Sequence, residues 1–182
     1  MSKKKVQPKK KKSSFKEYLP IIAIIVGVAL FVGAVVLFTA EKEITYAEAI
    51  VYYAYSNNQF AAEKVLVDSE NMEKGVVEAL MNEPLTPGLK KTVNGKVKVL
   101  SVDTVNGLCT VNLSEEFLLE NGNDVNKEAN AVYAIANSLG MLQSVREVKI
   151  NIEGDSECDL GHIKLSNTFF PEWNMVRFED RP

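Results

Sequence analysis

Reactive side chains are scarce in this 182-residue chain, which has one histidine, two cysteines and one tryptophan. An enzyme needs several such groups to converge on one site, and a single histidine leaves few ways to build one. The ten glycines are dispersed at turns and form no glycine-rich phosphate loop. These absences argue against most enzyme classes.

One nucleophilic pair is available in the composition, since Cys158 or Cys109 could act with His162. Cys158 lies four residues before His162 in a turn-rich segment, and that spacing does not aim the thiol at the ring. Glu157 and Asp159 flank Cys158, and neighbouring carboxylates raise the pKa of a thiol. We therefore expect no catalytic residues, and we expect His162 to be a structural side chain bonded to backbone.

The same segment holds alternating acidic residues that could offer oxygen ligands to Ca²⁺, namely Glu153, Asp155, Glu157 and Asp159. They do not follow the twelve-residue calcium-loop pattern, so we predict a solvated acidic turn, no metal and no cofactor. The two cysteines permit one disulfide in an oxidising compartment. Cys109 lies in a strand pattern and is expected to pack as a small apolar residue, and whether it pairs with Cys158 stays open.

The N-terminus combines a lysine-rich run with a long uncharged stretch. Residues 19–40 are apolar and as a helix would extend about 33 Å, enough to cross a hydrocarbon layer of roughly 30 Å. Lys and Arg are retained on the cytoplasmic side, which predicts residues 1–18 inside and the rest outside the membrane. The lysines are expected to set topology and face anionic lipid, since no nucleic-acid-binding pattern follows them.

A cleaved signal peptide has a shorter apolar core and a small residue where Phe38 stands, so we predict an uncleaved signal anchor. No cysteine follows the run, which excludes a lipoprotein. Eight of the 21 basic residues but one of the 24 acidic residues lie before position 41, which leaves about −10 on the remainder. Such an acidic domain is not expected to bind nucleic acid through bulk charge.

The segment after a short linker at 41–48 reads as one domain of strands and helices. Residues 49–55 and 64–67 have the β-branched and aromatic composition of strands. Asn71 is placed to cap a helix whose apolar face repeats at intervals of three and four and which ends at Pro84. A strand over 96–104 and a return strand over 108–113 flank Asn106-Gly107, the dipeptide typical of a type I′ hairpin.

A second helix is predicted after Asp124, with an apolar stripe at Val125, Ala129, Val132, Ala136 and Leu139. The alternation of residues 148–152 predicts the last core strand, and an edge hairpin with coil follows it. The order strand, helix, hairpin, helix, strand predicts an α+β fold with two helices on one face of a small mixed sheet. The domain is expected over 49–168, followed by a tail at 169–182.

This order and spacing resemble the GerMN domain of sporulation and spore-germination proteins. The matching positions are 98–102, 106–117, Ala79, Leu80, Pro84, Val145, Val148, Ile150, Gly154 and 161–166. The resemblance implies an extracytoplasmic, membrane-tethered domain of Gram-positive bacteria, with a fold similar to ring-building modules. It further implies a non-enzymatic role in assembly, with envelope or sporulation-channel proteins or further copies of the chain as partners.

The alternative is a module that binds cell-wall glycan or a small ligand, which would present exposed aromatics around one cleft. The tail concentrates large apolar side chains of the kind enriched in interface cores. These candidates for a partner surface are Phe169, Phe170, Trp173, Met175 and Phe178. The competing interpretation is that they cover the end of the sheet or lie against the bilayer.

Overall fold

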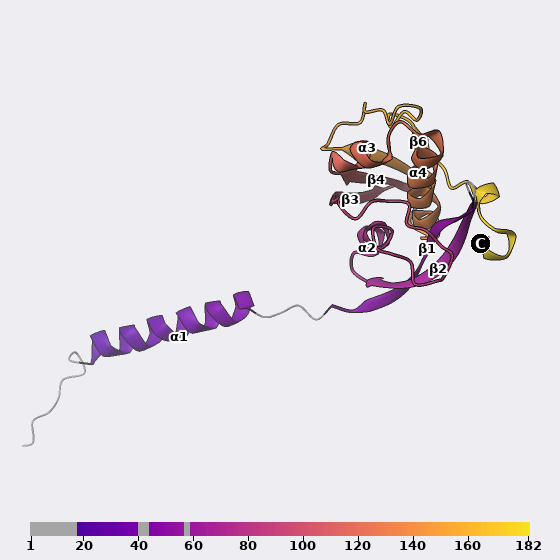
Figure 1. Cartoon of the computed structure of the whole chain (residues 1–182). Coiled ribbons are helices and arrows are strands. Elements are labelled where there is room, and N and C mark those ends of the chain that lie inside the picture. Colours follow the sequence, from indigo (N-terminus) through magenta and orange to yellow (C-terminus); the bar gives the residue numbers. More distant parts are fainter. Residues whose placement is uncertain (1–17, 40–43, 57–58) are drawn as a thin grey trace, which may run out of the picture. The chain divides into compact units, whose positions relative to one another are not determined.

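The computed structural model describes residues 18–39, 44–56 and 59–182, and the chain divides into two compact units, 1–43 and 44–182 (Figure 1). The first unit contains α1 (Leu19–Thr39), so the expected helix is formed. Among the helices that the structure describes, none is long and apolar enough to cross a membrane. Residues 1–17 of the basic segment lie outside these ranges.

The second unit begins with a two-stranded antiparallel ribbon. β1 (Tyr46–Ser56) pairs with β2 (Gln59–Asp68) in a register that places Tyr52 opposite Ala62. Both predicted strands are confirmed, but each is longer than its sequence pattern indicates, and β1 starts within the expected linker. The connecting residues 57–58 are outside the described part of the chain.

The remaining strands form a four-stranded mixed sheet in the order β3-β4-β5-β6, with β4 and β5 parallel. Their bounds are β3 (Val99–Val105), β4 (Leu108–Leu113), β5 (Glu147–Ile152) and β6 (Thr168–Phe169). Asn106 and Gly107 have φ of 53° and 90°, as a type I′ turn requires, which confirms the predicted hairpin. The expected edge hairpin is reduced to an isolated antiparallel bridge between Asp159 and Lys164, and the short β6 takes the sheet edge.

Three helices accompany the strands, namely α2 (Met72–Ala79), α3 (Glu116–Asn121) and α4 (Val125–Leu139). The predicted cap of α4 is confirmed, because the Asp124 carboxylate accepts from the backbone N–H of Asn126 and Lys127. Asn71 precedes α2 but its side chain donates to Asp68, and α2 ends before Pro84. α3 lies between β4 and α4, at positions where no helix was predicted.

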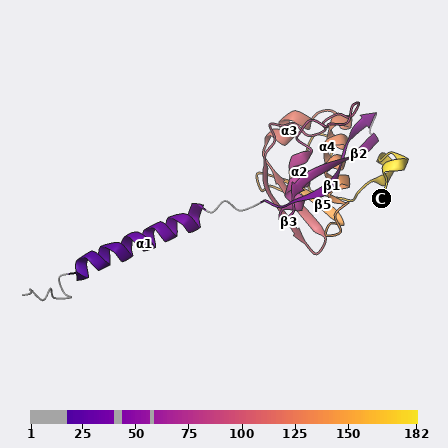
Figure 2. The ribbon, with the colours of Figure 1, turned by 90° about the horizontal axis from the view of Figure 1, so that it is seen from below.

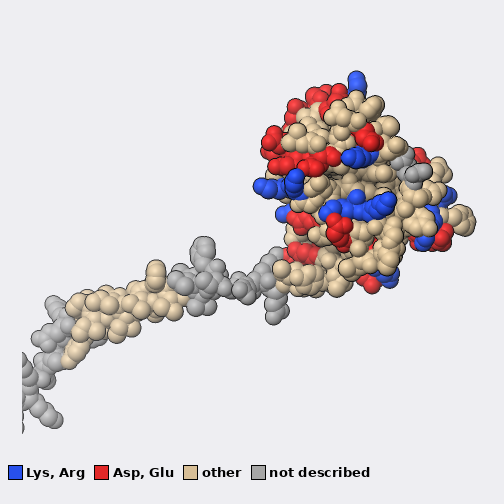
Figure 3. All heavy atoms as spheres, viewed as in Figure 1, with Lys and Arg blue, Asp and Glu red and all other residues tan. Residues whose placement is uncertain are grey.

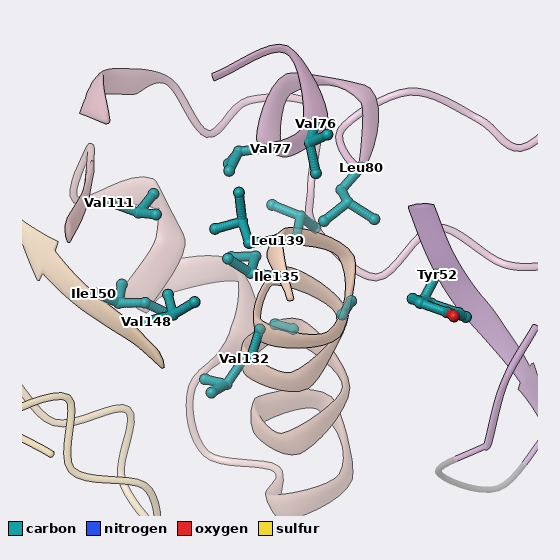
Figure 4. Close-up of a cluster of buried hydrophobic side chains, with 14 of the residues drawn as sticks. Tyr52, Val76, Val77, Leu80, Val111, Val132, Ile135, Leu139, Val148 and Ile150 are labelled. Atoms are coloured by element: carbon teal, nitrogen blue, oxygen red, sulfur yellow. The ribbon is translucent and has the colours of Figure 1, made fainter. Parts of the chain in front are cut away.

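The predicted α+β fold with a small mixed sheet is confirmed in part, but the first strand pairs in a separate ribbon, and α4 lies between the ribbon and the larger sheet. Figure 4 shows Val132, Ile135 and Leu139 of α4 with the four-stranded sheet on one side and Tyr52 of β1 on the other. The outer edge of β1 cannot join the larger sheet, since the backbone N–H of Tyr52 donates to Ser138 of α4 at 2.8 Å. The ribbon therefore forms a separate layer.

Candidate functional site

The five tail residues predicted to form a partner surface differ in their exposure to solvent. Phe169 is buried in β6 and packs edge-on against Tyr133, with ring centroids 6.3 Å apart. Trp173 packs edge-on against Tyr52 at 6.1 Å, and Met175 is half-buried against the core. Phe170 and Phe178 remain exposed.

Hydrogen bonds hold this tail against the ribbon, and Figures 1 and 2 both place it beside β1 and β2. The backbone N–H of Arg177 donates to the carbonyl of Phe60 at 2.9 Å, and the Tyr52 hydroxyl donates to the carbonyl of Asp180 at 2.8 Å. Burial, followed by the nearby charge of Asp180, raises the pKa of Tyr52 to about 12. Most of the tail thus packs on the ribbon, and two phenylalanines, Phe170 and Phe178, remain exposed.

A buried glutamate organises the loop that contains His162. Glu128 of α4 has no exposed surface, and its carboxylate accepts from the backbone N–H of His162 at 2.8 Å and of Ile163 at 2.9 Å. The ring Nδ1 of His162 lies 2.9 Å from the same carboxylate. The prediction that His162 bonds backbone with its ring is therefore wrong, since the ring partner is a carboxylate. Gly161, with φ of 119°, provides the conformation that brings this loop over the carboxylate.

The sequence reasoning missed Glu128 although a signal was present. Positions 128, 132, 135 and 139 follow helical spacing, so this glutamate shares the buried stripe with Val132 and Leu139. Val125, predicted to lie on that stripe, is 53% exposed instead. An acidic residue in an apolar stripe predicts a buried charge that needs partners.

The Glu128 carboxylate has the features of a structural anion. Burial alone would raise its pKa, but the hydrogen bonds from His162 and Ile163 outweigh burial and hold the pKa below the usual glutamate value. An acid that stays ionised and accepts three hydrogen bonds has little capacity to take a proton from a substrate. The hydrogen bonds to the Glu128 carboxylate therefore serve to hold the loop at residues 160–163 in place.

The two thiols are free and are poor nucleophiles in their settings. Cys109 of β4 is fully buried, as predicted for a core residue, and burial raises its pKa. The pKa of Cys158 is also raised, first by burial and then by Asp155 and Asp159. In the described part of the chain, neither thiol hydrogen-bonds His162, whose ring contacts Glu128.

Glu63 of β2 is a second buried acid with a structural function. Its carboxylate accepts from the backbone N–H of Leu85 at 3.0 Å and of Thr86 at 2.6 Å. Burial opposes ionisation, but these bonds lower the pKa of Glu63 below its usual value. They fix the loop after α2 beside β2, and they leave the Leu85 side chain 89% exposed.

An apolar strip follows β2 next to this loop. Leu66 is 71% exposed, and Ile44 and Tyr46 beside it are also exposed. Two hollows of about 410 and 430 Å³ flank the strand, and both are lined by Leu66, Ala79 and Asn82. We call this region, with Leu85, the β2 groove.

The charged surface offers no comparable site for a metal. Acidic side chains gather over the part of the domain that carries α3 on the face shown in Figure 3. Across residues 18–39, 44–56 and 59–182, no group of three or more His, Cys, Asp or Glu side chains is placed to hold a metal ion. Asp155 instead accepts from the backbone N–H of Glu157 in the acidic turn.

These features define a small α+β domain with two buried structural acids and an apolar groove along β2, and its family follows from its similarity to known proteins. The chain belongs to the Germane family, described as sporulation and spore germination, whose family model matches residues 50–158. This confirms the family resemblance read from the sequence. No curated protein matches the chain.

Solved structures share the fold at low sequence identity. The tandem GerMN domains of the sporulation protein GerM from Bacillus subtilis match with a TM-score of 0.59 and 21% identity, over 69% of this chain and 46% of that chain. The first GerMN domain of the same protein matches with 0.57 and 22%, over 68% and 97%. A putative lipoprotein from Clostridium perfringens matches with 0.50 and 20%, over 74% and 93%. This chain therefore spans less than half of the tandem-domain protein.

Proposed function

We propose that this protein is a non-enzymatic, membrane-anchored domain that assembles or scaffolds an envelope complex in sporulation or spore germination. The observation that carries the proposal is the β2 groove, an apolar surface beside an open strand edge. Soluble domains rarely leave contiguous apolar surface exposed without a binding partner. Membership of a sporulation and germination family supports the setting.

The titratable groups support a role without chemistry. Glu63 and Glu128 hold loops through hydrogen bonds to backbone N–H groups. The pKa of each thiol is raised, which lowers the fraction of reactive thiolate. In the described part of the chain, both acids are therefore engaged in structural hydrogen bonds, and both thiols favour the protonated form.

The proposed localisation is the cell membrane, with a cytoplasmic N-terminus and an extracytoplasmic domain. It rests on the sequence, namely the lysine run and the uncharged residues 19–40. Protease added to intact protoplasts should remove the domain and spare the N-terminal segment. A mature N-terminus near Glu41 would contradict the uncleaved anchor.

Crosslinking in cells tests assembly. Photo-reactive residues at Glu78 of α2 and Lys127 of α4, both exposed, should give discrete higher-order adducts of the full-length chain. Charge reversal near each position should remove those adducts, whereas the same change at exposed Glu115, the residue before α3, should not. The absence of adducts in cells that need the protein would overturn the assembly proposal.

The alternative, a module for cell-wall glycan or a small ligand, has less support. Sugar rings commonly stack on exposed aromatics, and none of the four hollows characterised in the described chain has more than one aromatic residue in its lining. Saturable binding of peptidoglycan fragments by the purified protein, together with no adducts in cells, would favour this alternative.

A further inference from the structure

The outer edge of β2 is occupied at one end and open at the other. The carbonyl of Phe60 accepts from Arg177 of the tail, and Phe60 forms an isolated parallel bridge with Val176. Backbone groups alternate in direction along a strand, so Ala62, Lys64 and Leu66 point their N–H and C=O groups to this same side. Within the described residues, no backbone hydrogen bond from another segment reaches these three.

An open edge is a template for another strand, and proteins usually protect it. Here the protection is weak: Lys64 is the one charged residue among the three, and Glu48 pairs with it at 2.9 Å. Leu66 beside it is 71% exposed. The free part of the edge is centred near this leucine, since the tail takes the position at Phe60.

We propose that this edge pairs antiparallel with the same edge of a second copy, about a two-fold axis at Leu66. This pairing rests on the assembly function proposed above, and it identifies a second copy of the chain as the partner at the β2 edge. In this register Leu66 faces Leu66 of the other copy, and Lys64 lies opposite Asp68. Opposite charges across an antiparallel pair are favourable, whereas an axis at Lys64 would set like charges against each other.

The side chains near the axis are compatible with this pairing. The Asp68 carboxylate accepts from the backbone N–H of Glu70 and the side-chain amide of Asn71, and the Asp68 carbonyl accepts from the backbone N–H of Asn71, so Asp68 is fixed at the strand end where this register sets it opposite Lys64. The nearby charges of the β2 groove are balanced, since Lys74 lies 3.6 Å from Glu78. A neutral, apolar and self-complementary strip suits an isologous contact.

The contact is short and therefore weak for free molecules, and tethering raises the effective concentration of copies. The test uses the full-length chain in lipid vesicles, with Leu66→Cys in a Cys158→Ser background. Opposed residues have Cβ atoms about 4.5–5.5 Å apart, near the range of a disulfide. Mild oxidation should give a disulfide-linked dimer at least about tenfold faster than for Leu119→Cys, an exposed leucine of α3.

Two further variants test the register. Lys64→Cys should crosslink slowly, because in this register residue 64 of one copy lies four residues, about 13 Å along the strand, from residue 64 of the other copy. Lys64→Glu in the Leu66→Cys protein should slow crosslinking several-fold, because it places a glutamate opposite Asp68. Faster crosslinking at 64 than at 66, or no effect of Lys64→Glu, would overturn the register.

Leu66→Cys that crosslinks no faster than Leu119→Cys would overturn self-pairing. In that case adducts to other proteins from Glu78 or Lys127 would still support the assembly function. The two proposals therefore fail separately.

Discussion

Replacing Glu128 with alanine removes the acceptor of three hydrogen bonds at the centre of the 160–163 loop. Hydrogen bonds to charged groups contribute about 1.5–3 kcal/mol each, but the losses do not add fully when the donors can reach water. The His162 side chain is 56% exposed, so the freed loop can rehydrate. We expect Glu128→Ala to lower the free energy of unfolding by about 3 kcal/mol, and Glu128→Gln by about 1.5 kcal/mol because it keeps volume and one acceptor.

The pH dependence of this loss has a definite sign. Burial favours the protonated form of Glu128, but the hydrogen bonds favour the carboxylate more strongly. The pKa of Glu128 is therefore lower in the folded protein than in the unfolded chain. Its contribution is therefore complete above the unfolded glutamate pKa, near 4.5, and disappears as pH falls through the lower folded value. The difference between wild type and Glu128→Gln should persist down to about pH 5 and should shrink in more acidic solution, where Glu128 becomes protonated.

Urea unfolding followed by circular dichroism measures these differences, and amide hydrogen exchange at residues 162 and 163 reports the local effect. His162→Ala removes one partly exposed contact and should cost about 0.5 kcal/mol. Glu115→Ala, at an exposed glutamate, should change stability by less than about 0.5 kcal/mol. A Glu128→Ala protein as stable as His162→Ala, with unchanged exchange in the loop, would refute the reasoning.

Five substitutions at four positions test the core and the tail by the same unfolding measurement. Cys109→Ala should cost roughly 1 kcal/mol or more because it leaves a cavity, whereas Cys109→Val should be nearly neutral, and lost function in a stably folded Cys109→Val protein would count against a core role. Gly140→Ala should cost about 1–2 kcal/mol because its Cβ would overlap Pro171, so stabilisation would show that the tail is not docked there. Trp173→Ala should cost about 2 kcal/mol and Phe178→Ala, 82% exposed, less than about 0.5 kcal/mol, and equal effects would contradict the division of the tail.

Several elements follow from local sequence because their causes are local. Asn106-Gly107 adopts positive φ at both positions and forces a tight hairpin whatever surrounds it. Asp124 satisfies the first backbone donors of α4 from its own side chain. The alternation of 148–152 is buried as predicted in β5. The order of strands and helices, and with it the family, could therefore be predicted.

The sequence did not indicate which sheet each strand joins. Alternating apolar residues show that a strand has a buried face, but they do not identify the neighbour on its edge. On its outer edge β1 meets Ser138 of α4, 86 positions away in the chain, and forms an isolated bridge from Ala54 to Lys90, so it does not meet a strand of the larger sheet there. The separation into two sheets with α4 between them is thus a tertiary result.

The functional residues show the same division. The composition of the tail predicts apolar contacts, but docking on Tyr52 and Phe60 decides that Trp173 is covered while Phe178 is exposed. The partner of His162 is Glu128, 34 positions away, so no spacing in the local segment could reveal it. Turns, caps and strand faces depend on neighbours within a few residues and were readable from the sequence, whereas edges, ion partners and exposed surface depend on which distant segments meet, which only the folded chain decides.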